Sequence, residues 1–221
     1  MICSGERSKP EIGQKTCLRD LRLLKTRMDP HIFDPASDIP PLIILDVQDA
    51  INQPIWDGKN NPGYIEVIET LLTAWRAAAA PVIHVKHDEA NPNSSYHTHG
   101  PWNAIQTRVA PVAGEPVVTK TENCAFIGTT LDETLKHLGA ARFVITGVVI
   151  HNSMDATIRA GAALGYDILL PGDATTAVPV KGHSGKMWTA AEVYDLFLAV
   201  LGGEYATVTS SGALISALAG D

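Results

Sequence analysis

Short runs of apolar residues alternate along the chain with longer segments in which apolar residues recur at helical spacing. The first run, Leu42–Leu45, contains no polar residue, which is typical of a strand buried on both faces. After Asn61 and Pro62, which resemble a helix start, apolar residues recur every three or four positions up to Ala79 and predict a helix. The same alternation predicts further strands at 82–85, 117–119, 143–146, 168–170 and 205–209, helices that begin near residues 130, 153 and 189, and a last short helix that carries Leu214 and Leu218.

This order of elements predicts the fold class. Strands that alternate with helices form βαβ units, so we expect an α/β fold: a doubly wound, mostly parallel six-stranded sheet with helices on both faces, in a Rossmann-like three-layer arrangement. Two capping boxes support the helix starts, Thr130 with Glu133 and Thr189 with Glu192. Residues 87–116 show no periodicity, and so long a loop inside a domain is typical of a wall or lid over a site.

The charge distribution separates the start of the chain from the rest. Residues 1–28 contain seven Lys or Arg and three acidic residues, whereas the whole chain has a net charge of −7. We therefore predict a loosely ordered basic N-terminal extension over 1–28 and a single domain over 29–221. The acidic balance argues against nucleic acid as a partner, and no apolar run approaches the roughly 18–20 residues that cross a membrane. Three cysteines without metal-type spacing are typical of a reducing compartment, and we expect a cytoplasmic protein.

Polar residues follow three of the predicted strands. Asp46 comes directly after the first strand, Lys120 directly after the third, and Ser153 shortly after the fourth. Each has an ordinary explanation alone: Asp46 as a turn or capping residue, Lys120 as a solvated surface lysine, Ser153 as an N-cap. In parallel sheets, however, ligands bind beyond the carboxyl ends of the strands, where all three would meet. We therefore predict a site in which a desolvated Asp46 is a general base, Lys120 pairs with it, and Ser153 lies at a helix N-terminus that favours negative charge.

The segments around these residues resemble the motifs of a known family. Asp46 stands in Leu-Ile-Ile-Leu-Asp-Val-Gln, Lys120 in Lys-Thr-Glu-Asn-Cys-Ala-Phe, and Ser153 in Gly-Val-Val-Ile-His-Asn-Ser-Met-Asp. In order and spacing, the chain is similar to the isochorismatase-like superfamily of cysteine hydrolases, which includes nicotinamidases, carbamoylsarcosine amidohydrolases and related amidases. The resemblance implies a doubly wound α/β sheet, an Asp/Lys/Cys catalytic triad and a cis peptide bond between Val148 and Val149.

The sequence departs from the family pattern at the nucleophile, where Ser153 stands in place of the usual cysteine. A thiol has a pKa near 8.5 and ionises readily, whereas a serine hydroxyl needs a well-matched base. Three explanations stay open: Ser153 is an engineered replacement that traps a substrate, it is a natural variant that attacks slowly or only activates water, or Asp46 donates a proton without a covalent intermediate. Cys124 is expected to be packed and inert, and a Ser153–His151 pair is disfavoured because adjacent turn residues usually point apart.

Hydrolysis of a non-peptide C–N bond in a small-molecule amide is the reaction that the resemblance implies. Asp46 would act first as the base and later as the acid to the leaving amine, with Lys120 stabilising charge. The backbone N–H groups of Val149 and Ser153 would bind the oxyanion. We expect the pocket to be completed by the long loop with Tyr96 and Trp102, and its walls to include Trp56, Phe126 and Asn152.

Two other functions stay open. The first is isochorismatase-type ether hydrolysis with Asp46 as the proton donor, which needs cations for two substrate carboxylates; the candidates are Lys59, Lys86 and Arg108. The second is an inactive small-molecule binding protein.

No metal or cofactor is predicted. Nicotinamidases of the superfamily hold zinc or a similar ion through an Asp-x-His motif, whereas after Asp49 this chain has no histidine before His84. His84, His87, His97 and His99 are expected to be packed or solvated rather than metal ligands. No glycine-rich dinucleotide motif follows the first strand. Ala-rich and Met/Trp helix faces favour a homo-oligomer, either a dimer or a tetramer.

Overall fold

A short strand without polar residues, β1 (Leu42–Leu45), lies inside a parallel sheet in the computed structural model, which describes residues 32–36 and 38–220. The predicted basic extension over 1–28 lies outside the described residues. The strand order is β3-β2-β1-β4-β5-β9, with a short strand β6 beside β4, and every neighbouring pair is parallel. The other strands of this sheet are β2 (Val82–His87), β3 (Val117–Lys120), β4 (Arg142–Val148), β5 (Asp167–Pro171), β6 (Thr175–Thr176) and β9 (Thr207–Thr209).

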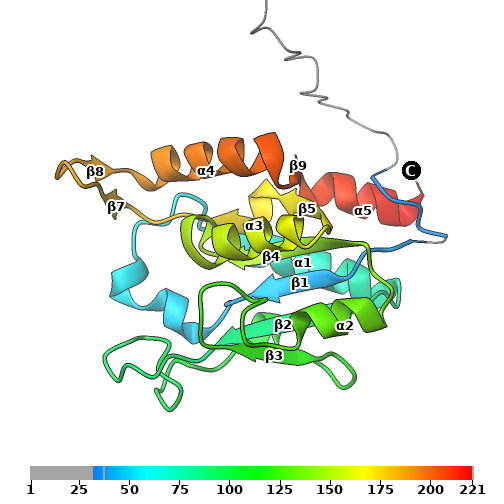
Figure 1. The fold of residues 1–221 in the computed structure, drawn as a ribbon, viewed down its shortest axis with the longest axis horizontal. Helices are drawn as coiled ribbons and strands as arrows, with labels where there is room; N and C mark the ends of the chain where they lie inside the picture. The colour runs from blue at the N-terminus through cyan, green and yellow to red at the C-terminus, as the bar shows by residue number, and fades with distance from the viewer. Residues whose placement is uncertain (1–31, 37, 221) are drawn as a thin grey trace, which may run out of the picture. The chain divides into compact units, whose positions relative to one another are not determined.

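Helices cover both faces of the sheet (Figure 1). Successive residues of a strand point to opposite faces, so Leu42 and Ile44 join one buried cluster, whereas Ile43 and Leu45 join another. The first cluster includes residues of α1 (Tyr64–Ala77) and α5 (Ser211–Ala219). The second includes residues of α2 (Leu131–His137), α3 (Asp155–Ala163) and α4 (Ala190–Glu204). The predicted doubly wound α/β fold is therefore confirmed.

The six predicted strands are present, and the additional elements are all short. Beside β6, a separate hairpin pairs β7 (Val180–Lys181) with β8 (Met187–Trp188). Each of these three strands is only two residues long, which is too short to produce a periodic pattern of apolar residues in the sequence. Short 3₁₀-helical turns also occupy the predicted loops, at Asp49–Asn52, Pro54–Trp56, Thr107–Val109 and Gly172–Ala174.

The helices α1, α2 and α4 begin within two residues of their predicted starts, but two of the predicted caps do not form. The capping box of Thr189 and Glu192 is present and opens α4. At α2, in contrast, the Thr130 side chain makes no capping hydrogen bond, and the N–H of Leu131 donates to Thr129 Oγ1 instead. Helix α1 begins at Tyr64 rather than at Pro62, because the Asn61 amide donates to the carbonyl oxygens of Asp173 and Thr175 and so serves a tertiary contact.

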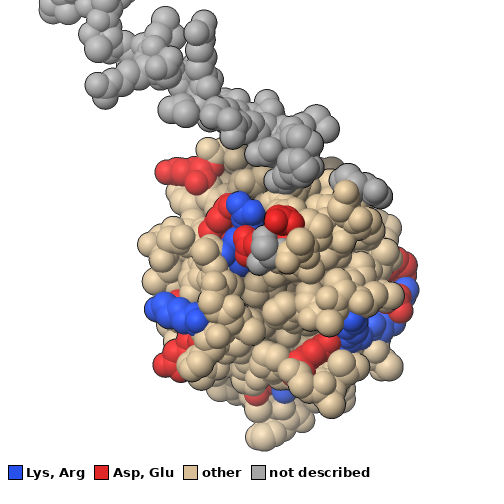
Figure 2. Space-filling model, turned by 90° about the vertical axis from the view of Figure 1, so that its right-hand side faces the viewer, with Lys and Arg blue, Asp and Glu red and all other residues tan. Residues whose placement is uncertain are grey.

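Most Lys and Arg side chains of the described surface pair with an acidic side chain. On the face seen in Figure 2, Lys and Arg side chains lie beside Asp and Glu rather than in a patch of a single sign. Arg142 with Asp167 is one such pair. Among the residues that the structure describes, no helix is both long enough and apolar enough to cross a membrane.

A partly buried ion-pair cluster ties α1 to the segment before β3. The two carboxylate oxygens of Glu115 accept hydrogen bonds from Arg76 Nε at 2.7 Å and Nη2 at 2.8 Å, and Oε2 lies 2.8 Å from His84 Nε2. The hydrogen bond from Arg76 is the main reason that the pKa of Glu115 falls from 4.5 to about 2. A carboxylate whose pKa is lowered by folding stabilises the folded state above its unfolded pKa and loses that effect as the pH falls through its folded pKa.

Glu115→Gln is therefore expected to lower the free energy of unfolding by about 1–2 kcal/mol at pH 7, since it removes one charge of a partly buried pair. The difference from the unchanged protein should shrink progressively as the pH is lowered from 4.5 toward 2. Urea denaturation at pH 7 and at pH 3 measures both quantities. An equal loss of stability at the two pH values would show that packing, and not the ion pair, is responsible.

Candidate active site

Asp46 directly follows β1 and adopts an unusual backbone conformation. Its φ is 58°, in the left-handed region that few residues other than glycine occupy. Its N–H still donates to the carbonyl oxygen of Val85, so the sheet holds the residue in place. The side chain is buried, and among the described residues its Oδ1 has no hydrogen-bond partner. Strained conformations of this kind persist where the surrounding structure fixes a functional side chain.

Lys120 ends β3 and is the centre of the site. Its ammonium is fully buried and lies 2.8 Å from Asp46 Oδ2 and 3.2 Å from Ser153 Oγ. Two further groups are in hydrogen-bond range, His87 Nδ1 at 2.9 Å and the carbonyl oxygen of Glu122 at 3.0 Å. In the structure, the Lys120 ammonium thus lies within hydrogen-bond distance of both other predicted residues, Asp46 and Ser153. His87 is a fourth member of the group that the sequence did not predict.

Ser153 lies in a π-helical turn, Ile150–Met154, that joins β4 to α3. The sequence predicted that the helix begins at about Ser153, but the helical turn already begins at Ile150. π-helical turns are rare and frequently occur at functional sites. The peptide bond between Val148 and Val149, immediately before this turn, is cis.

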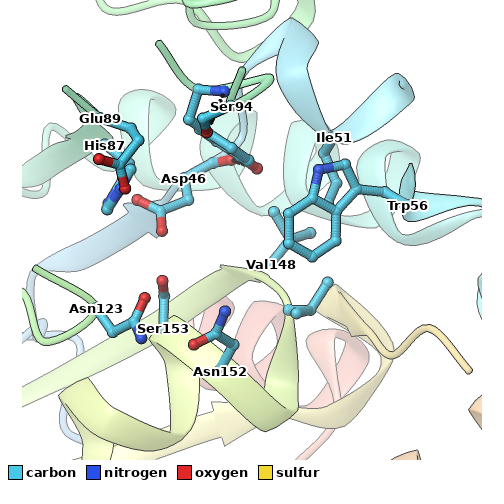
Figure 3. A pocket seen from close by; sticks show the side chains of 12 residues that line it. Asp46, Ile51, Trp56, His87, Glu89, Ser94, Asn123, Val148, Asn152 and Ser153 are labelled. Atoms are coloured by element: carbon cyan, nitrogen blue, oxygen red, sulfur yellow. Dashed lines mark hydrogen bonds and ion pairs between the residues drawn. The ribbon is translucent and has the colours of Figure 1, made fainter. Parts of the chain in front are cut away.

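These side chains open onto a cavity of about 160 Å³ (Figure 3). Asp46 and Ser153 face each other across it, with His87 and Glu89 at one end and Trp56 and Ile51 at the other. A cavity of about 150 Å³ accommodates a molecule the size of benzene. The remaining lining residues are Ser94, Tyr96, Asn123, Val148, Val149 and Asn152.

Of the three predicted pocket walls, Trp56 and Asn152 line the cavity and Phe126 does not. Phe126 packs against the rings of Phe143 and Tyr166, at centroid distances of 6.3 and 5.8 Å. It therefore contributes to the core under α3 rather than to the site. In the long loop, Tyr96 lines the cavity and donates from its hydroxyl to the Asp46 carbonyl oxygen, whereas Trp102 does not line it.

His87, Glu89 and Asn123 are cavity residues that the sequence did not predict. His87 had a readable signal, because it ends β2 as Lys120 ends β3, and the two are direct partners in the β2–β3 register. Gln48 fixes the His87 backbone by accepting from its N–H at 2.7 Å and donating to its carbonyl oxygen at 2.9 Å. Glu89 and Asn123 lie in segments without periodicity, where no sequence pattern indicates which way a side chain points.

Burial and charge determine the protonation of the site. Desolvation raises the pKa of Asp46, although the positive charge and hydrogen bond of Lys120 oppose the increase. Desolvation, followed by the charge of Lys120, lowers the pKa of His87, so its imidazole is neutral near pH 7. Because the Lys120 ammonium can only donate, His87 Nδ1 is the acceptor, and the ring proton lies on Nε2. That nitrogen is 3.9 Å from Glu89 Oε2.

The histidines considered as metal ligands are separated in the fold. His84 points to Glu115, His87 to Lys120, and His97 packs edge-on against His99. Within residues 32–36 and 38–220, no three His, Cys, Asp or Glu side chains are grouped so that they could hold a metal ion.

The fold and this site define the class of protein. Residues 40–204 match the isochorismatase domain, and the chain belongs to the isochorismatase family, whose members are hydrolases and include amidohydrolases.

Among its relatives, the uncharacterized isochorismatase family protein YrdC of Bacillus subtilis is 35% identical over 79% of this chain and 94% of that one. A crystal structure of an isochorismatase-family protein from Chromobacterium violaceum has a TM-score of 0.81 and 36% identity, covering 86% of this chain and 98% of the other. Streptothricin hydrolase of Streptomyces noursei is 29% identical over 65% of this chain and 57% of its own length.

Proposed function

We propose that this family hydrolase cleaves a non-peptide C–N bond in a small-molecule amide, with Asp46, Lys120 and Ser153 as its catalytic residues. The observation that carries the proposal is the position of the Lys120 ammonium, 2.8 Å from the Asp46 carboxylate and 3.2 Å from the Ser153 hydroxyl, beside a cavity that both residues line. A base, a nucleophile and a fixed positive charge are the groups that acyl transfer requires.

The reaction begins when Ser153 Oγ attacks the amide carbonyl carbon and its proton passes to the Asp46 carboxylate. The negative charge that develops on the carbonyl oxygen is stabilised by the backbone N–H groups of Val149 and Ser153. The C–N bond then breaks while the Asp46 proton passes to the leaving nitrogen, which leaves an ester on Ser153. Water attacks this ester with Asp46 again accepting a proton, and the acid is released as the Ser153 hydroxyl regains its proton.

Lys120 has two tasks in this sequence of steps. It holds Asp46 Oδ2 and leaves Oδ1 as the free oxygen that exchanges the proton. Its charge also favours the ionised form of Asp46, which accepts the proton of Ser153. Desolvation favours the neutral form, which gives the proton to the leaving nitrogen. His87 Nδ1 accepts a hydrogen bond from the ammonium and helps to fix it beside the two reacting residues.

Hydrolysis of a dicarboxylate ether receives no such support from the cavity. Arg108 pairs with Glu66 and Glu69 on the surface, Lys86 pairs with Asp88, and Lys59 donates to the carbonyl oxygen of Trp56. None of these three cations lines the cavity, so substrate carboxylates would meet Asp46 and Glu89 instead. This charge distribution favours the amide over the ether.

Asp46→Asn is expected to lower amide turnover by about 100-fold or more, because the variant can neither accept nor return the proton. In the unchanged protein, activity should fall on the acid side through a pKa above the ordinary value of 3.8, since burial raises the pKa of Asp46 and the base must be ionised. Both quantities are measured as kcat/KM for a panel of primary and secondary amides between pH 4 and 9.

Asp49→Asn is the matched control, because Asp49 lies in the short helix after β1 and does not line the cavity. It should leave turnover within about twofold. Amide hydrolysis that survives Asp46→Asn would contradict the proposed mechanism. An absence of turnover in the unchanged protein and in Ser153→Cys, with retained ligand binding, would indicate a binding protein instead.

A further inference from the structure

We propose that the end of the cavity formed by His87 and Glu89 binds a positively charged organic group of the substrate. The preferred amide would then carry an ammonium or guanidinium group at this end and an apolar group at the end formed by Trp56 and Ile51. This assignment of substrate class rests on the proposed amide hydrolysis, but the cation-binding end can be tested separately.

Glu89 is held in place and, among the residues that the structure describes, has no Lys or Arg partner. Its N–H donates to the Tyr96 carbonyl oxygen at 3.0 Å, and Oε1 accepts from the N–H of Asn91 at 3.1 Å. No Lys or Arg of the described chain forms an ion pair with it, and His87 Nε2 is 3.9 Å from Oε2. The Glu89 side chain is 38% exposed, so it can reach both the cavity and solvent. Within the described part of the chain, its carboxylate is therefore an acceptor at the rim of the site without a Lys or Arg partner.

The charges that line the cavity do not balance. Asp46 is matched by Lys120, and His87 is neutral, so Glu89 contributes a net negative charge. The backbone hydrogen bond from Asn91 lowers the pKa of Glu89, which keeps this charge at neutral pH. Two other lysines of the described chain have partners of their own: Lys86 pairs with Asp88, and Lys59 donates to the Trp56 carbonyl oxygen. An anion facing a partly closed cavity favours a cationic ligand and disfavours a carboxylate.

The opposite end of the cavity is apolar and rigid. Figure 3 shows Trp56, Ile51 and Val148 on the far side of Asp46 from Glu89. The Trp56 indole donates from Nε1 to Ser95 Oγ at 3.0 Å and packs edge-on against Tyr96, with ring centroids 6.0 Å apart. Its polar atom is therefore satisfied, and its ring presents hydrocarbon to a ligand. The reacting groups, Asp46 and Ser153, lie between the two ends.

Two series of matched amides test the assignment, one for each direction of the scissile bond. The first contains N-(2-aminoethyl)isobutyramide as the cation, N-propylisobutyramide as the neutral analogue and N-isobutyrylglycine as the anion. The second reverses the amide, with 3-amino-N-isobutylpropanamide, N-isobutylbutanamide and malonic acid mono-isobutylamide. Hydrolysis by the unchanged protein and by Ser153→Cys is measured, and binding of the same compounds to Ser153→Ala is measured by calorimetry, with EDTA present throughout.

In at least one series, the cation is expected to be preferred over its neutral analogue by about 3- to 10-fold in kcat/KM or affinity, and the anion to be disfavoured, as for one partly exposed ion pair. Glu89→Gln should abolish this preference. Glu133→Gln, which removes the same charge from the exposed surface of α2, should retain it.

The outcomes separate the two proposals. Hydrolysis without a cation preference, or with a preference that survives Glu89→Gln, would overturn the cation-binding end and leave the amide hydrolase in place. Tighter cation binding that Glu89→Gln abolishes, without hydrolysis of any amide, would support the cation-binding end and overturn the proposed function. Failure of every compound to bind or react would overturn both. A preference that appears only when EDTA is omitted would assign this end to a metal ion and overturn the organic cation.

Discussion

Ser153→Cys is expected to raise amide turnover on the order of 100-fold. A well-matched proton acceptor contributes roughly this factor to the attack of a hydroxyl, and a thiol depends on such an acceptor far less. A few per cent of an ordinary thiol is ionised at pH 7, and the neighbouring Lys120 ammonium stabilises a thiolate. The serine hydroxyl depends on the Asp46 carboxylate, which is a weak base even though burial raises its pKa. The measurement is kcat/KM for the amide panel, with mass spectrometry to detect an acyl group on the new thiol.

Ser94→Cys is a demanding control for this gain. Ser94 also lines the cavity but is not among the hydrogen-bond partners of Lys120. A thiol there should leave amide turnover unchanged and should not become acylated. Equal turnover by the unchanged protein and Ser153→Cys, without an adduct on either, would contradict a covalent mechanism and favour activation of water by Asp46.

Gly147→Ala is expected to destabilise the fold by at least about 3 kcal/mol, through a steric overlap and an unfavourable φ together. Gly147 lies opposite Leu45 in the β1–β4 register, with φ of 132°. A Cβ atom at this position would lie 2.1 Å from the Leu45 carbonyl oxygen, a backbone atom that cannot move aside. The strand ends that place Asp46 and Ser153 would have to separate. Thermal and urea denaturation measure the loss.

Gly139→Ala separates the two contributions to this loss. Gly139 also has a positive φ, 67°, but an added Cβ would meet no atom within 4 Å. It should cost only about 1–2 kcal/mol, the penalty of a left-handed backbone for alanine. Similar losses for the two variants would show that the contact between Gly147 and Leu45 is not as close as the structure has it.

The central sheet could be predicted from the sequence because its strands are buried on both faces. Leu42–Leu45 contains no polar residue, and the position of polar residues directly after such strands predicts that they converge at one edge of the sheet. The helix starts were less predictable, because the Asn61 side chain is used for a contact with residues more than a hundred positions away. The preference of a residue type for a helix end depends only on its neighbours in the sequence, and a tertiary hydrogen bond of its side chain overrides that preference.

The cavity walls were predicted unevenly for a similar physical reason. Phe126 lies close in sequence to Lys120, but the direction of its side chain is determined by the rings of Phe143 and Tyr166. The sequence pattern places His87 at the start of the long loop, whereas in the structure it ends β2 and faces Lys120 in register. Sequence spacing locates the ends of strands, whereas the direction of a side chain beyond a strand end depends on contacts that the sequence does not display.

The long connection between β2 and β3 contributes Glu89, Ser94 and Tyr96 to the cavity, whereas Asp46, Lys120 and Ser153 come from the ends of sheet strands or the turn after β4. In the proposed mechanism, the reacting groups and part of the lining that selects the substrate therefore lie in separate parts of the chain. Loops tolerate insertion and exchange far better than buried strands do. Changes in this connection could thus alter substrate preference in relatives while the residues that transfer protons stay the same. Exchanging the connection between family members is a direct way to transfer a substrate preference.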